Sequence, residues 1–95
     1  MFIVSLRYTR PLEEVDALLA QHVEWLRAGH AAGHFLAWGR KVPRDGGMLF
    51  MRADSRADAE ALAVEDPFVK GGVAEVEVIE FAAGFAGPGL EALQA

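Results

Sequence analysis

Alternating apolar residues open the chain and predict a β-strand over residues 2–8. Phe2, Val4 and Leu6 share one face, and the segment is rich in β-branched and aromatic residues. The spacing of apolar residues then changes to three and four, which is typical of a helix with one buried face. The apolar positions of this helix are Leu12, Val15, Leu19, Val23 and Leu26.

Turn-forming residues set the ends of this helix and of a hairpin after it. Pro11 stands at the start of the helix, and the glycines at 29 and 33 end it. Strands are predicted over 34–42 and 48–52, with a Pro- and Gly-containing turn over 43–47.

The second half of the chain repeats a helix and a strand. Ser55 is a suitable N-cap for an alanine-rich helix that closes at Asp66-Pro67, and residues 74–81 predict a fourth strand. A tail rich in Gly and Ala covers 82–95. The order βαββαβ predicts an α+β, ferredoxin-like fold with a four-stranded antiparallel sheet and two helices on one face. We expect one domain over residues 1–95.

Both faces of the predicted strands keep large apolar side chains. Two helices cover only one face of the sheet, so a monomer would expose an apolar patch on the other. We therefore expect a homodimer that packs through this second face, with the 82–95 tail able to cross to the partner. The opposed sets are Phe2, Val4 and Leu6 against Ile3; Phe35 against Leu36 and Trp38; Met48 and Phe50 against Leu49 and Met51; and Val76 and Val78 against Ile79 and Phe81.

Composition and charge narrow the classes of function. Hydrophobic residues make up 53% of the 95, enough for one compact core. The net charge of −5 offers no basic face for nucleic acid, and the absence of cysteine excludes thiolate nucleophiles and cysteine-ligated zinc. No segment approaches the roughly 20 apolar residues of a membrane span, and the first residues do not form a signal peptide. We expect a cytoplasmic protein without membrane contact.

Familiar cofactor and metal motifs do not occur. No glycine-rich loop has the order required for a dinucleotide or a phosphate group. His30 and His34 are four residues apart, but Gly33 is expected to break the helix between them. Arg40, Lys41 and Arg44 form a basic hairpin tip, which is either a solvated turn or a clamp for an anionic substrate. We therefore expect neither a cofactor nor a metal.

His22 and Asp66 interrupt apolar helix faces. His22 falls in the buried stripe of the first helix, and Asp66 continues the buried face of the second, four residues after Leu62. Helices on the same face of the sheet can bring the two side chains together, and an imidazole oriented by a carboxylate is a competent acid–base unit. The alternative is structural: a satisfied core histidine, and an aspartate that caps a new turn beginning with proline.

Several short motifs follow one another in an informative order: Tyr8, Pro11-Leu-Glu-Glu-Val-Asp, His22-Val-Glu-Trp-Leu, Gly33-His-Phe-Leu-Ala-Trp-Gly39, Gly46-Gly47 and Asp66-Pro-Phe68. In these motifs the chain, up to about Phe81, resembles the YCII-related (YciI-like) family. The resemblance implies a dimeric α+β barrel with an active site at His22 and Asp66. It also implies cofactor-free lyase or isomerase chemistry on small ring-derived metabolites.

One segment departs from the family pattern. The family usually has Ala-Ser-Gly-Pro at the end of the second strand, where this chain has Ala37-Trp38-Gly39-Arg40. Trp38 either lines the substrate pocket or belongs to the dimer interface. We assign Trp38, Arg7, Tyr8 and Phe68 as substrate-binding candidates.

Together these features predict a small-molecule enzyme that performs acid–base chemistry of the lyase or isomerase type at His22 and Asp66, on a substrate that the sequence does not identify. Two alternatives stay open. One is a non-catalytic dimeric module that binds a metabolite or supports a larger enzyme. The other is a cofactor-independent oxygenase of the same architecture.

Overall fold

The computed structural model describes residues 1–94. Two short helical regions, each divided in two, separate the strands of this structure. In order the elements are β1 (Phe2–Tyr8), α1 (Leu12–Asp16), α2 (Leu19–Ala31), β2 (Phe35–Arg40), β3 (Gly46–Met51), α3 (Arg56–Ala63), α4 (Pro67–Lys70) and β4 (Ala74–Glu80), followed by a short 3₁₀ turn, η1 (Glu91–Gln94).

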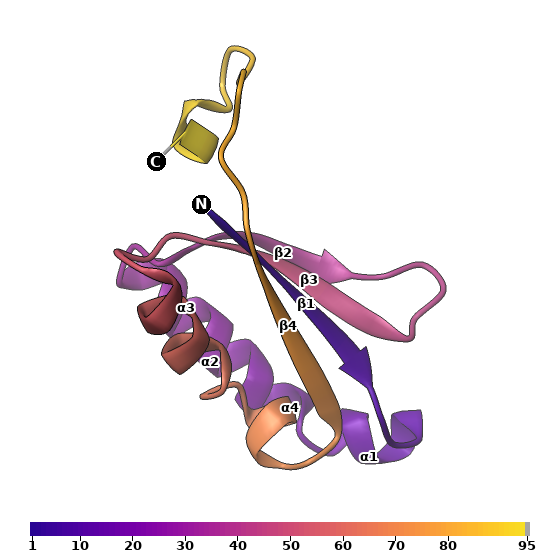
Figure 1. The fold of residues 1–95 in the computed structure, drawn as a ribbon. Helices are drawn as coiled ribbons and strands as arrows, with labels where there is room; N and C mark the ends of the chain where they lie inside the picture. The colour runs from indigo at the N-terminus through magenta and orange to yellow at the C-terminus, as the bar shows by residue number, and fades with distance from the viewer. Residues whose placement is uncertain (95) are drawn as a thin grey trace.

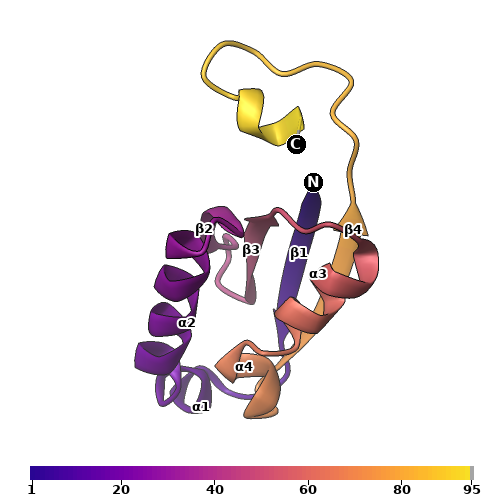
Figure 2. The same ribbon diagram turned by 90° about the vertical axis from the view of Figure 1, so that its left-hand side faces the viewer.

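The four strands form one antiparallel sheet in the order β2-β3-β1-β4. Helices α2, α3 and α4 all lie on the same face of this sheet, and the opposite face is left without a helix (Figures 1 and 2). The predicted α+β, ferredoxin-like fold is therefore confirmed. Among residues 1–94, no helix combines the length and the apolar character that crossing a bilayer requires.

The first helical region differs from the single helix that its spacing predicts. Helix α1 ends at Asp16 and α2 begins at Leu19, with a tight turn in which Leu18 N–H donates to Val15 O over 3.0 Å. Val15 is fully buried, and Leu18 packs against the same apolar cluster, which includes Phe68. Tertiary packing thus accounts for a break that the spacing of apolar residues does not indicate.

The second helical region is also divided, and the division changes the setting of Asp66. Helix α3 ends at Ala63, and α4 begins at Pro67 with Asp66 as its N-cap. The Asp66 carboxylate accepts a hydrogen bond from Phe68 N–H at 2.9 Å. Asp66 therefore lies at the positive end of a new helical turn instead of continuing the face of the preceding helix.

Strand β2 contains an irregularity that decides where Trp38 points. Strict alternation predicts Trp38 on the face opposite Phe35. The register shifts between Phe35 and Ala37, so Phe35 pairs with Met51 and Trp38 pairs with Leu49. Met51 and Leu49 are both buried beneath the helices, so Trp38 and Phe35 share that face, as expected for a β-bulge.

Two apolar clusters fill the space between the sheet and the helices. One contains Val4, Leu26 and Leu49, and the other contains Leu6, Val15 and Phe68. Residues after β4 leave this body, as Figure 1 shows for the yellow segment, and Phe85 in that segment is 84% exposed.

Gly46 allows β3 to lie close to β1, and its substitution should measure how tightly the sheet is packed. A Cβ at this position would lie 1.8 Å from the Leu6 carbonyl oxygen. We expect Gly46→Ala to lower the free energy of unfolding by about 1–3 kcal/mol, because backbone atoms must move apart. Gly84→Ala is the control, since no atom lies within 4 Å of its added Cβ. Equal urea midpoints for the two variants would contradict this account.

Candidate active site

A cavity of about 230 Å³ lies between the helix-covered face of the sheet and α2. It is formed where the two apolar clusters meet, because Val4 and Leu26 from one cluster and Leu6 and Phe68 from the other all line it. Its volume is below the range of about 300–1,000 Å³ that is usual for drug-sized ligands, and suits a molecule with a single ring.

His22 and Asp66 meet in the wall of this cavity. His22 Nδ1 lies 2.7 Å from Asp66 Oδ1, although the residues are 44 positions apart in the chain. The side chain of His22 is 12% exposed and that of Asp66 is 1% exposed. An ionised carboxylate can only accept, so Nδ1–H is the donor and neutral His22 is held as the Nδ1–H tautomer.

Phe68 fixes the plane of the imidazole. The rings of His22 and Phe68 stack with their centroids 3.9 Å apart and an interplanar angle of 9°. No residue among 1–94 forms a hydrogen bond with His22 Nε2, and His22 lines the cavity. Nε2 is therefore the ring nitrogen available to a bound molecule.

The two oxygens of the Asp66 carboxylate differ in their hydrogen bonds. Oδ1 accepts from both His22 and Phe68 N–H, whereas Oδ2 is buried without a hydrogen-bond partner among the described residues. A buried carboxylate with little compensation stabilises positive charge on a neighbouring group. Asp66 can thus orient the imidazole and stabilise the imidazolium that forms when Nε2 takes a proton.

The structure separates the four substrate-binding candidates. Tyr8, Trp38 and Phe68 line the cavity, and the Tyr8 ring meets the edge of Phe68 at 5.9 Å. Trp38 is 42% exposed, with the His30 ring 6.2 Å away in an edge-to-face arrangement.

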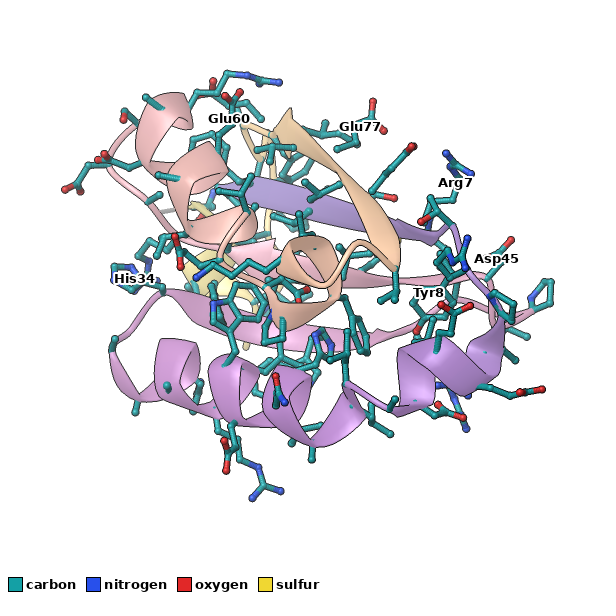
Figure 3. The ribbon with its side chains drawn as sticks, turned by 90° about the horizontal axis from the view of Figure 1, so that it is seen from below. Arg7, Tyr8, His34, Asp45, Glu60 and Glu77 are labelled. Carbon is teal, nitrogen blue, oxygen red and sulfur yellow. The ribbon has the colours of Figure 1, made fainter. Side chains whose placement is uncertain are left out.

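Arg7 does not reach the cavity. It follows Leu6 in β1 and therefore points to the other face of the sheet, where it pairs with Glu75. Both side chains are more than half exposed, and Figure 3 shows Arg7 and Glu77 at the side of the sheet away from α2. The structure therefore gives Arg7 no contact with the other candidates.

Sequence reasoning did not single out Trp25, and it left two settings open for the basic hairpin tip. Trp25 lines the cavity, and its position three residues after His22 on one helix was the available signal. Of the three residues of that tip, Arg40 and Arg44 line the cavity and Lys41 does not. Arg44 donates to Asp16 Oδ1 at 2.5 Å, and this bond raises the pKa of Arg44 above its ordinary value.

The residues that line the cavity are mostly apolar, and the described part of the chain groups no three His, Asp or Glu side chains as metal ligands. Fold and site together define a ferredoxin-like α+β domain with a His–Asp pair in an aromatic cavity. A sequence model of the YCII-related domain matches residues 1–82. The chain belongs to the YCII-related family.

A solved structure has the same fold. It is the 5-chloro-2-hydroxyhydroquinone dehydrochlorinase from Burkholderia phenoliruptrix AC1100, in complex with 2,5-dihydroxybenzoquinone. The TM-score is 0.72 with 23% sequence identity, covering 88% of this chain and 96% of that chain. At this identity the likeness shows the fold alone. A search of curated proteins found no match.

The hydrogen bond between His22 and Asp66 can be tested through the tautomer of the imidazole. We expect ring-nitrogen NMR shifts of neutral His22 to report the Nδ1–H form, because Asp66 Oδ1 accepts that proton. Asp66→Ala removes the acceptor and should allow the Nε2–H form to appear. A dominant Nε2–H form in the unmodified protein would show that the contact is not the one described.

Proposed function

We propose that this protein is a small-molecule enzyme that uses His22 as its general acid–base group. The observation that carries the proposal is the 2.7 Å contact between His22 Nδ1 and the buried Asp66 carboxylate, in the wall of a cavity. Nε2 accepts a proton from the substrate, and Asp66 stabilises the resulting imidazolium. Trp38, Tyr8 and Phe68 supply apolar and aromatic contacts to the substrate.

The reaction that suits these residues is an elimination or an isomerisation. In an elimination His22 takes a proton from the substrate, and the electron pair of that bond to hydrogen forms a new π bond. The leaving anion, such as chloride, departs with the electron pair of its own bond. In an isomerisation the same group returns the proton to a different atom. Neither reaction consumes an oxidant or a reductant, so the substrate itself must be activated by a neighbouring carbonyl or hydroxyl group.

The structural neighbour supports this class of reaction. It is a dehydrochlorinase of a hydroxylated ring, and its structure holds a dihydroxybenzoquinone. A cavity of about 230 Å³ lined by Trp25, Trp38, Tyr8 and Phe68 is compatible with a planar ring of that size. Chlorinated hydroxyquinols and dienelactones are therefore the first substrates to test.

Turnover of these compounds tests the proposal. We expect His22→Ala and Asp66→Asn each to lower kcat by about 100- to 10,000-fold, the usual contribution of a positioned acid or base. Asn can still cap α4, so the Asp66 variant should fold normally. The double variant should be no slower than the slower single variant, because the two residues act as one unit.

His34→Ala is the control, because His34 does not line the cavity. Chloride release and circular dichroism are the readouts. Saturable binding of these compounds without turnover would show that the protein is a metabolite-binding module and not an enzyme for them. Oxygen consumption coupled to turnover would instead identify an oxygenase.

We further propose that the protein forms a homodimer through the sheet face that carries no helix. Apolar side chains on and beside this face are partly exposed: Met48 is 43% exposed, and Ile79 and Phe81 are each 41% exposed. The strand register places Ile3 and Phe50 on the same face. A second copy would remove this apolar patch from water.

Light scattering at micromolar concentration should give twice the chain mass of 10.3 kDa. Ile79→Asp should shift the mass to that of a monomer, because it places a charge within the apolar patch. Ala57→Glu, at an exposed position of α3, should leave the dimer unchanged. A monomer mass for the unmodified chain would rule out this assembly.

A further inference from the structure

Two arginines line the cavity, and they differ in whether the guanidinium has a partner within the protein. Arg44 lies in the turn between β2 and β3, bonds Asp16, and places its guanidinium 5.9 Å from the centre of the Tyr8 ring. The guanidinium of Arg40, the last residue of β2, forms no ion pair or hydrogen bond with any residue among 1–94. Arg40 is therefore the cation beside the cavity that has no protein partner.

The strand register points Arg40 to the cavity side of the sheet. Arg40 pairs with Gly47, two positions after Trp38, which pairs with the buried Leu49. Alternate residues of a strand share a face, so Trp38 and Arg40 both point toward the helices. Gly47 and Arg40 both line the cavity.

The charges around the cavity favour an anion locally. The chain carries a net charge of −5, so its overall field does not attract anions. Asp66 is the one carboxylate that lines the cavity among the described residues, and it is buried and engaged by His22 and Phe68 N–H. A molecule in the cavity therefore meets cationic guanidinium groups and no exposed carboxylate.

We propose that Arg40 binds a carboxylate carried by the ring of the substrate, while Trp38 packs against the ring. This inference rests on the proposed function, because it assigns a substrate class to the same cavity. A guanidinium matches a carboxylate with two parallel N–H···O bonds, which a single phenolic oxygen cannot accept in the same way. The substrate class is a planar, conjugated ring acid with one ring.

Binding can be measured without turnover. The chain has two tryptophans, Trp25 and Trp38, and both line the cavity, so their fluorescence should report a ligand. The probes are para-hydroxybenzoate and its neutral methyl ester, with calorimetry as a second measurement. We expect the acid to bind about tenfold or more tightly than the ester, because only the ionised carboxylate can accept both charge-assisted N–H···O bonds.

Arg40→Gln should remove this preference by weakening binding of the acid far more than binding of the ester, and Arg40→Lys should restore part of it. Arg27→Gln is the matched control, because Arg27 is exposed on α2 and does not line the cavity. The preference should also fall as salt is added.

Equal affinity for acid and ester, absence of binding by either probe, or equal weakening of both probes by Arg40→Gln would each overturn the inference. The outcome is separate from the proposed function. If the protein prefers the acid through Arg40 but turns over no substrate, this inference stands and the proposed enzymatic function is wrong. If neutral rings are turned over at the same rate with and without Arg40→Gln, the enzymatic function stands and this inference is wrong.

Discussion

One carboxylate oxygen holds the site together. Asp66 Oδ1 accepts from the backbone N–H of Phe68, in the first turn of α4, and from the imidazole of His22 on α2. Phe68 in turn stacks on His22, so the same three residues contact one another in a closed set. The cap that starts α4 therefore also places the ring that orients the imidazole. A buried pair of titratable side chains must give up its hydration, so it usually adds little net stability. Its presence in an apolar wall supports a chemical role for the pair.

The order of strands and helices was predictable because it depends on local periodicity. Alternation marked β1 and β4, and the spacing of three and four marked α2. The division of both helical regions was not predictable in the same way. The break before Leu19 depends on how Val15 and Leu18 pack against Phe68, residues that are far apart in the chain. The start of α4 was available as an alternative, because Asp66-Pro67 is a local N-cap signal.

The candidate site shows the same limit. His22 and Asp66 stood out because each interrupts the apolar face of a predicted helix, and both line the cavity. Trp38 was harder to place, because a bulge after Phe35 reverses the face that simple alternation assigns to it. Arg7 and Tyr8 are neighbours in a regular strand, so alternation alone places their side chains on opposite faces of the sheet. The bulge leaves no mark in the local pattern, since it arises from pairing with β3.

The charges of the cavity also bear on the chemistry proposed for it. Removal of a proton by His22 leaves negative charge on the substrate, and such charge is stabilised by cations that are already in place. Arg40 and Arg44 line the same cavity, whereas the one lining carboxylate among residues 1–94 is buried behind the imidazole. Asp16 and Tyr8 hold Arg44, so its guanidinium needs little rearrangement when charge develops. An acidic chain thus keeps two guanidinium groups beside the place where the proposed reaction develops negative charge.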